Sequence, residues 1–252
     1  MGGNTIVNFE GGVALGSVFG GGHNGSVGTH LVDVDNPNYG KMKHDVVDDP
    51  ATPDVDESET HGHITLNITG GIIGNPYEHV EEPVGGNVFG GCEGSATSPL
   101  WKKLARAKQT EVHITGSPVI KGSVFGGPEQ GTIVIDTIKD GSGDIVRLDG
   151  GNAHVLIEGG TIGSMFNTAS AITGNDTTLH VGGSVFGGGK GVILADKDFS
   201  GIVMRNTTVD IQGGRIYYNI YGGGEMASVG LTRDSIASAS GNHYHVPVMT
   251  IL

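Results

Sequence analysis

A tetrad of Val-Phe-Gly-Gly recurs along this chain and limits its possible folds more than any other feature. The motif begins at Val18, Val88, Val124 and Val185, and a fifth copy beginning at Ile220 has tyrosine in the aromatic position. A short motif that returns many times is typical of repeat proteins, in which each unit buries its apolar face against its neighbours. The tetrad therefore predicts a stack of equivalent structural units.

A second repeated element lies upstream of these tetrads. In it, two β-favouring residues flank one variable residue, and a glycine pair follows after one more position. Its copies lie at residues 7–12, 66–71, 155–160 and 209–214, and residues 112–117 differ only in ending with serine. The alternation of positions predicts short β-strands.

The spacing of the repeats indicates how the strands stack. A weaker sixth copy of the tetrad, Met-Phe-Asn-Thr at residues 165–168, begins 20 residues before Val185. About 20 residues suffice for one turn of a β-solenoid, whose coils stack in parallel at roughly 4.8 Å. We therefore predict an all-β fold: a right-handed parallel β-solenoid, or β-helix, of about six coils with loop insertions and one short helix, forming a single domain over residues 1–252.

Glycine is the residue that this repeat keeps most strictly. The chain has 47 glycines among 252 residues, roughly 19%, against a usual share of about 7%. Both glycines of the tetrad are kept in the five good copies, whereas the next position varies; it holds Gly22, Cys92, Pro128, Gly189 and Gly224. We predict that the two tetrad glycines form corners with positive φ and no room for a Cβ, which agrees with Asn167 at the first of these positions in the weak copy.

The tetrads also predict two columns of side chains along the solenoid. One is aliphatic, and the other is aromatic; the aromatic column contains Phe19, Phe89, Phe125, Phe186 and Tyr221. Two interpretations of the aromatic column remain open. Its rings are either buried at a corner, which we favour, or exposed as a ladder that could bind sugar.

The repeat resembles the glycine-rich surface proteins of gut anaerobic bacteria, in which units such as V-x-I-x-G-G-x-I-x-G-x-V-F/Y-G-G-G recur in very long chains. The resemblance covers the five good units and not the segments between them. It implies a secreted or cell-surface, adhesin-like protein, and it supplies no catalytic residues. From it we expect an extracellular structural or adhesive module that binds glycans or other cell-surface ligands through its insertions.

Charge and composition exclude several classes of partner. Lys and Arg number 14 against 27 Asp and Glu, a net charge of −13, which disfavours binding to nucleic acid or anionic lipid. The single cysteine, Cys92, excludes an internal disulfide. The sequence contains no run of about 18 apolar residues and therefore predicts no transmembrane helix. Its first residues lack the pattern of a signal peptide.

The two ends of the sequence both fall within the repeat pattern. Residues 5–7 already belong to one repeat, and residues 246–252 have the pattern of an opening strand. Without polar caps, the terminal coils of a solenoid expose unpaired backbone groups and an open slice of core. We therefore expect a fragment of a longer chain that self-associates through the ends of its solenoid.

Specific activity is expected in three insertions, at about residues 29–62, 97–109 and 231–244. The first contains nine acidic side chains and two lysines before His61. Asp33 and Asp35 are candidate calcium ligands, although the glycine and glutamate of an EF-hand are not in their places. Residues 140–144 form a similar, incomplete pattern. We favour a solvated acidic loop and expect no required cofactor, with calcium as the alternative.

The second insertion contains the one predicted helix, at residues 98–108, beginning with a serine cap and a proline. Its apolar side and four basic residues allow two interpretations. The helix either buries Trp101 against the flank of the solenoid, which we favour, or contacts an anionic membrane or a partner.

Candidate chemistry is otherwise sparse. Two His-x-His pairs, His61 with His63 and His243 with His245, have a spacing that suits a transition metal, but no third ligand is identifiable. No nucleophile elbow, phosphate-binding loop or recurring acidic pair is present. We therefore expect no enzyme activity; the alternative is a carbohydrate-active β-helix enzyme, a polysaccharide lyase or hydrolase.

Overall fold

The computed structural model describes residues 3–28, 61–76, 86–95, 105–139, 145–163, 165–167, 178–180, 182–192, 200–230, 233–237 and 243–247. Side chains are described for these residues except 136–148, 165–167, 178–180, 233–237 and 243–247. The described residues form β-strands, turns and no helix, so the prediction of an all-β protein is confirmed. None of them forms a helix long and apolar enough to cross a membrane.

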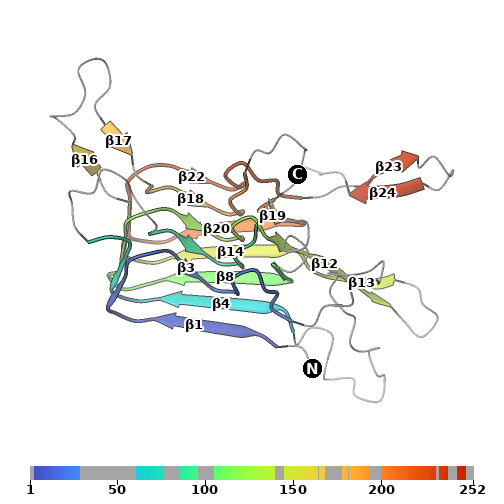
Figure 1. Ribbon diagram of the computed structural model, residues 1–252, viewed down its shortest axis with the longest axis horizontal. Coiled ribbons are helices and arrows are strands. Elements are labelled where there is room, and N and C mark those ends of the chain that lie inside the picture. Colours follow the sequence, from blue (N-terminus) through green and yellow to red (C-terminus); the bar gives the residue numbers. More distant parts are fainter. Residues whose placement is uncertain are drawn as a thin grey trace.

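Three parallel sheets of five strands each make up the solenoid (Figure 1). The long sheet contains, in order, β1 (Thr5–Phe9), β4 (His63–Ile68), β8 (Gln109–Ile114), β14 (Asn152–Ile157) and β20 (Thr207–Ile211). The second sheet contains β2 (Val13–Ala14), β5 (Ile72–Ile73), β9 (Val119–Ile120), β15 (Thr161–Ile162) and β21 (Arg215–Ile216). The third contains the tetrad strands β3 (Val18–Phe19), β6 (Val88–Phe89), β10 (Val124–Phe125), β18 (Val185–Phe186) and β22 (Ile220–Tyr221).

One strand from each sheet, taken in chain order, makes one coil, and the described residues contain five such coils. A shorter sheet of β7 (Arg106–Ala107), β11 (Thr132–Ile133) and β19 (Ile202–Val203) closes coils two to four. The expected count of about six coils is not confirmed. The weak sixth tetrad lies in β16 (Met165–Asn167), which pairs antiparallel with β17 (Thr178–His180) and is an excursion from the fourth coil.

Strict alternation along the long sheet builds the main core. In β4, β8 and β14 every second side chain is buried, and the strands pair so that equivalent residues stack, as in Leu66, Val112 and Val155. These three side chains are fully buried, together with the valines of the inner tetrads. A one-residue slip in the register would turn this whole set outward, so the apolar pattern fixes the stacking.

The aromatic column is a continuous stack of five rings. Neighbouring ring centroids lie 4.7 to 4.8 Å apart, with interplanar angles of 3° to 15°. Phe89, Phe125 and Phe186 are buried as a cluster of their own beside the main core, which confirms the buried interpretation for the inner coils. At the last coil Tyr221 is 44% exposed.

The tetrad glycines are required for a reason that differs from the predicted one. Neither tetrad glycine has a positive φ in any of the five coils, and Asn167 has none. A Cβ on Gly126 would instead lie 2.5 Å from the carbonyl oxygen of Gly187 in the next coil. Positive φ occurs at the second glycine of the upstream element, as at Gly71, and close approach of stacked backbones requires the tetrad glycines.

The predicted helix at residues 98–108 is wrong where the structure describes it. Arg106 and Ala107 form β7, and Ala107 stacks on Ile133 of β11 as part of the core. Its register on the neighbouring coil overrides the local helical pattern, since the backbone of this segment hydrogen-bonds to the coils on both sides. Trp101 lies outside the described residues.

The insertions follow a two-coil alternation. The first, third and fifth coils are each followed by an excursion, at residues 29–60, at the hairpin of β12 (Ile135–Lys139) with β13 (Ile145–Gly150), and at the hairpin of β23 (Arg233–Ala237) with β24 (His243–Pro247). The second and fourth coils instead carry extra residues on both sides of the tetrad. In the second coil these are residues 77–85 and 96–104, and in the fourth coil they are residues 164–181 and 193–199. In Figure 1 the β12–β13 and β23–β24 hairpins project from one side of the solenoid, and β16–β17 projects from the other.

Each excursion before a tetrad leaves through two glycines with positive φ that contact each other. In the second coil these are Gly74 and Gly86, and a Cβ on either would lie 3.0 Å from the Cα of the other. In the fourth coil Gly163 and Gly183 make the equivalent contact. The chain can therefore leave and re-enter at this corner without altering the cross-section of the coil.

These contacts predict that a glycine-to-alanine substitution lowers stability at one tetrad position and changes it little at the equivalent position of the last coil. Gly126→Ala should lower the free energy of unfolding by about 2 to 3 kcal/mol, because the new methyl group overlaps a stacked carbonyl. Gly222→Ala should change stability little, since a Cβ there meets nothing within 4 Å. Urea unfolding of both variants measures the difference, and equal losses would contradict the role of close stacking.

Candidate functional site

The outer face of the long sheet is polar and regular. Its side chains stand in columns, because the strands pair in parallel without any shift of register. One column contains Ile6, Thr65, Glu111, His154 and Thr208, and the next contains Asn8, Asn67, His113, Leu156 and Asp210. The face therefore presents rows of hydrogen-bonding groups at the spacing of the strands.

Many of these groups bind one another. Asn67 donates a hydrogen bond of 2.8 Å to the side chain of Asn8 in the adjacent strand. The Nε2 atom of His154 lies 2.9 Å from the Asp210 carboxylate, and the His113 ring meets the His154 ring edge-on at 6.4 Å. These cross-strand contacts stabilise the sheet, and they leave carboxylate, imidazole and amide groups at a half-exposed surface.

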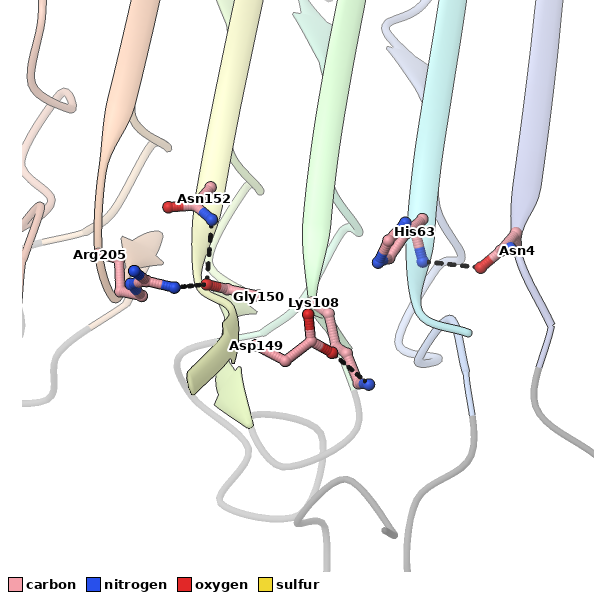
Figure 2. A network of polar contacts seen from close by, with 7 residues as sticks. All are labelled: Asn4, His63, Lys108, Asp149, Gly150, Asn152 and Arg205. Atoms are coloured by element: carbon pink, nitrogen blue, oxygen red, sulfur yellow. Dashed lines mark hydrogen bonds and ion pairs between the residues drawn. The ribbon is translucent and has the colours of Figure 1, made fainter. Parts of the chain in front are cut away.

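A buried ion pair lies at the edge of this face, where the β12–β13 hairpin joins the solenoid (Figure 2). The Lys108 ammonium donates a hydrogen bond of 2.7 Å to the Asp149 carboxylate, and the exposed fractions of the two side chains are 0% and 9%. Lys108 stands between β7 and β8, and Asp149 belongs to β13. The pair therefore attaches the root of the hairpin to the third coil.

His63 lies in the neighbouring strand, on the same edge. Its backbone N–H donates to the Asn4 side chain at 3.0 Å, as Figure 2 shows. Burial lowers the pKa of the His63 imidazole, and the charge of Asp149 acts in the opposite direction. The imidazole therefore favours its neutral form, which is also the form that binds metals.

A second set of ionisable side chains forms a column at the corner after the tetrads. The three residues that follow each tetrad's aromatic are Gly-Gly and the variable position, and the next residue is ionisable in every coil: His23, Glu93, Glu129, Lys190 and Glu225. Backbone bridges connect these residues from coil to coil in that order. His23 Nδ1 lies 2.8 Å from a Glu93 carboxylate oxygen, and Lys190 Nζ lies 3.9 Å from one of Glu129.

Glu129 is the member of this corner column whose pKa is shifted by its surroundings. Burial raises the pKa of its carboxyl group, and Glu93 and Glu225 raise it further, while Lys190 lowers it. The charged form of Glu129 is therefore held at a cost in the folded protein.

The structure brings few of the sequence-predicted site residues together. The calcium candidates Asp33 and Asp35, and residues 140–144, lie outside the described residues. His61 is buried and His63 half-buried, whereas His243 and His245 belong to β24 in a separate hairpin. Over the described part of the chain, no three His, Cys, Asp or Glu side chains are grouped as a metal site would need.

Two of the described arginines contact a backbone carbonyl or an aromatic ring. Arg205 donates a hydrogen bond of 3.3 Å to the Gly150 carbonyl, and the Arg215 guanidinium lies 5.9 Å from the centre of the Tyr217 ring. Arg106 projects from β7, where burial lowers its pKa. The half-exposed outer face of the long sheet offers hydrogen-bond donors and acceptors suited to hydroxyl-rich ligands.

Two of these features, the corner column and the Lys108–Asp149 pair, were not predicted from the sequence. The corner column had a visible signal, because the position after each Gly-Gly-x is ionisable in all five copies. The Lys108–Asp149 pair had none, since the two residues are separated by a hairpin and their burial depends on its path.

Comparison with known proteins identifies no relative: no protein-family model, curated protein or solved structure matches this chain.

The corner column predicts a stabilising substitution. Because folding raises the pKa of Glu129, the folded chain binds its proton more readily than the unfolded chain, and this carboxyl costs stability as the pH rises above about 4.5. Glu129→Gln should therefore raise the melting temperature at pH 7, with an advantage that shrinks as the pH falls towards 4. A lower melting temperature for the variant at pH 7 would show that the contact with Lys190 dominates.

The buried ion pair predicts strong coupling between its partners. Lys108→Met alone or Asp149→Leu alone should cost about 3 to 5 kcal/mol, since each removes one member of a buried, hydrogen-bonded pair of opposite charges. The double variant should recover most of that loss. A double-mutant cycle by urea unfolding measures the coupling, and additive losses would contradict it.

Proposed function

We propose that this chain is an extracellular structural or adhesive module, a right-handed β-solenoid that displays ligand-binding insertions. The observation that carries the proposal is the placement of the insertions. Excursions leave the solenoid only between strands, at corners that recur every second coil, and the strands of all three sheets keep an unshifted register across them.

The corners support a display role because they separate the scaffold from its insertions. The Gly74–Gly86 and Gly163–Gly183 contacts close the coil beneath the two excursions that precede a tetrad, so the length of these two excursions does not affect the core. Loops held on a rigid frame are the usual sites of specific binding. The Lys108–Asp149 pair adds a fixed attachment for one hairpin.

The chemistry of the insertions and of the adjacent face suits polar ligands. The segment at residues 29–60 is strongly acidic, and the outer face of the long sheet carries amide, imidazole and carboxylate groups. Glycans of cell surfaces, whose hydroxyl groups donate and accept hydrogen bonds, are therefore the ligand class that we propose. Calcium bound through Asp33 and Asp35, as an ion that bridges the chain and its ligand, is the alternative to a solvated acidic loop.

A glycan array combined with a reducing-sugar assay tests the proposal. The full chain should bind a subset of glycans and release no reducing ends from them. A variant without residues 29–60 should lose binding to some of that subset while keeping its melting temperature, because β7 already joins β8 through a single residue in a coil without this insertion. Glu129→Gln removes one negative charge from the corner column, outside both the insertions and the outer face, and serves as the control that should keep glycan binding.

Two results would overturn the proposal. Release of reducing ends would favour the carbohydrate-active enzyme instead. Unchanged glycan binding after each insertion in turn has been removed would mean that the insertions are not the binding elements.

A further inference from the structure

Exposed apolar side chains are confined to the two ends of the solenoid. Among the described residues, the exposed large hydrophobic side chains all belong to the first or the fifth coil. They are Ile6, Val13, Leu15, Ile211, Tyr218, Ile220, Tyr221 and Met226. We call the open surface of the first coil the N-terminal face and that of the fifth coil the C-terminal face. Apolar exposure of this kind marks an interaction surface.

The glycines of the C-terminal face indicate what binds there. In the first four coils the first tetrad glycine leaves room for the backbone of the next coil. A Cβ on Gly20 would lie 2.6 Å from the Gly90 oxygen, and a Cβ on Gly187 would lie 2.5 Å from the Gly222 oxygen. Among the described residues, Gly222 itself has no atom within 4 Å of its Cβ position, and its φ is not left-handed. Nothing in its own coil requires glycine there, but a further coil stacked on this face would.

The N-terminal face shows the mirror situation. In the inner coils the first glycine of the upstream element faces the preceding coil, so that a Cβ on Gly70 would lie 2.5 Å from the Glu10 oxygen. The equivalent Gly11 has nothing within 4 Å and no positive φ. Both faces are therefore shaped to receive the backbone of another coil in the same orientation.

Charge distinguishes between the possible orientations of such a partner. The corner column begins with His23 on the N-terminal face and ends with Glu225 on the C-terminal face. Stacking the C-terminal face of one copy on the N-terminal face of another brings Glu225 opposite His23, the same kind of pair that His23 and Glu93 form at 2.8 Å. Two C-terminal faces would instead meet with coils that wind in opposite senses, which cannot continue the parallel register of the column.

We infer that a second copy of this chain binds head to tail, with its first coil stacked in register on the fifth coil of the copy before it. Tyr221 then lies over Phe19 of the next copy and extends the aromatic stack. The N–H of Gly222 donates to the carbonyl of Phe19 in the next copy, as the N–H of Gly187 donates to Tyr221 at 2.8 Å within the chain. The inference is independent of the display function, since it uses only the two end faces.

This interface is expected to be weaker than the contact between inner coils. It brings together a first and a fifth coil, both of which are followed by an excursion just before the next long-sheet strand or at the equivalent corner. In the described solenoid, two coils of this kind are always separated by a coil whose extra residues lie at other corners. The net charge of −13 also opposes association, and added salt should strengthen it by screening.

Two variants that each block one face provide the test by sedimentation velocity. Gly222→Val blocks the C-terminal face and Gly11→Val the N-terminal face, and at neither position does an added Cβ lie within 4 Å of a described atom of the same chain. The wild type should associate with rising concentration, and each variant alone should stay monomeric. An equimolar mixture should form dimers and nothing larger, because each variant retains one complementary face.

Controls keep the result interpretable. Thr65→Val, on the outer face of the second coil, should associate like the wild type, and both blocked variants should keep the wild-type melting temperature when dilute. Glu225→Lys adds no bulk to the stacked backbone. Made in an otherwise wild-type chain, this substitution should weaken self-association. A wild type that stays monomeric at low and high salt, a Gly222→Val variant that associates like the wild type, or dimers of Gly11→Val alone would each overturn the inference.

Discussion

Close approach of one backbone coil to the next is the interaction on which this structure depends. The coils are joined by parallel hydrogen bonds with no shift of register. At the first tetrad glycine of the first four coils, a carbonyl oxygen of the next coil lies too close to leave room for a Cβ, 2.5 Å from its position at Gly126. Only glycine permits that contact. Once the tetrads are stacked in this way, the valine and phenylalanine beside them stack as well, and the main core and the aromatic column follow from the same register.

The same constraint separates what is constant in the molecule from what varies. Strand residues and tetrad glycines contact equivalent residues above and below, so a change in one coil affects its neighbours. The excursions leave through glycine corners such as Gly74 and Gly86, where the chain separates from the stack. Their two-coil alternation means that the structural repeat of this protein is a pair of coils, although the sequence motif repeats once per coil.

Much of the solenoid could be predicted from the sequence, because its signals are local and repeated. The tetrads form the third sheet and the upstream elements form the long sheet, and the phenylalanines of the inner coils are buried as expected. The reason for the tetrad glycines could not be predicted, since a positive φ and a close backbone contact both select glycine. The weak copy at Met165–Asn167 and the helical pattern over Arg106 and Ala107 were misleading because each was judged by local sequence, whereas pairing with a distant strand decides the structure of these residues.

Among the candidate sites, only those that repeat from coil to coil can be predicted from the sequence. The corner column from His23 to Glu225 was visible as a periodic position, but Lys108 and Asp149 meet only because a hairpin returns to the third coil. Ligands that bind the insertions would be equally hidden from a search for repeated motifs, because the insertions do not repeat.

The central claim is that the coils stack in register through backbone hydrogen bonds at the tetrads. Hydrogen exchange of individual amides, measured by NMR on dilute protein, tests it most directly. The amides of Gly90, Gly126 and Gly187, which each donate to the next coil, should exchange slowly and at similar rates, while the Gly222 amide on the open face exchanges much faster. Fast exchange at Gly126, or equal protection at Gly126 and Gly222 in the monomer, would contradict the account.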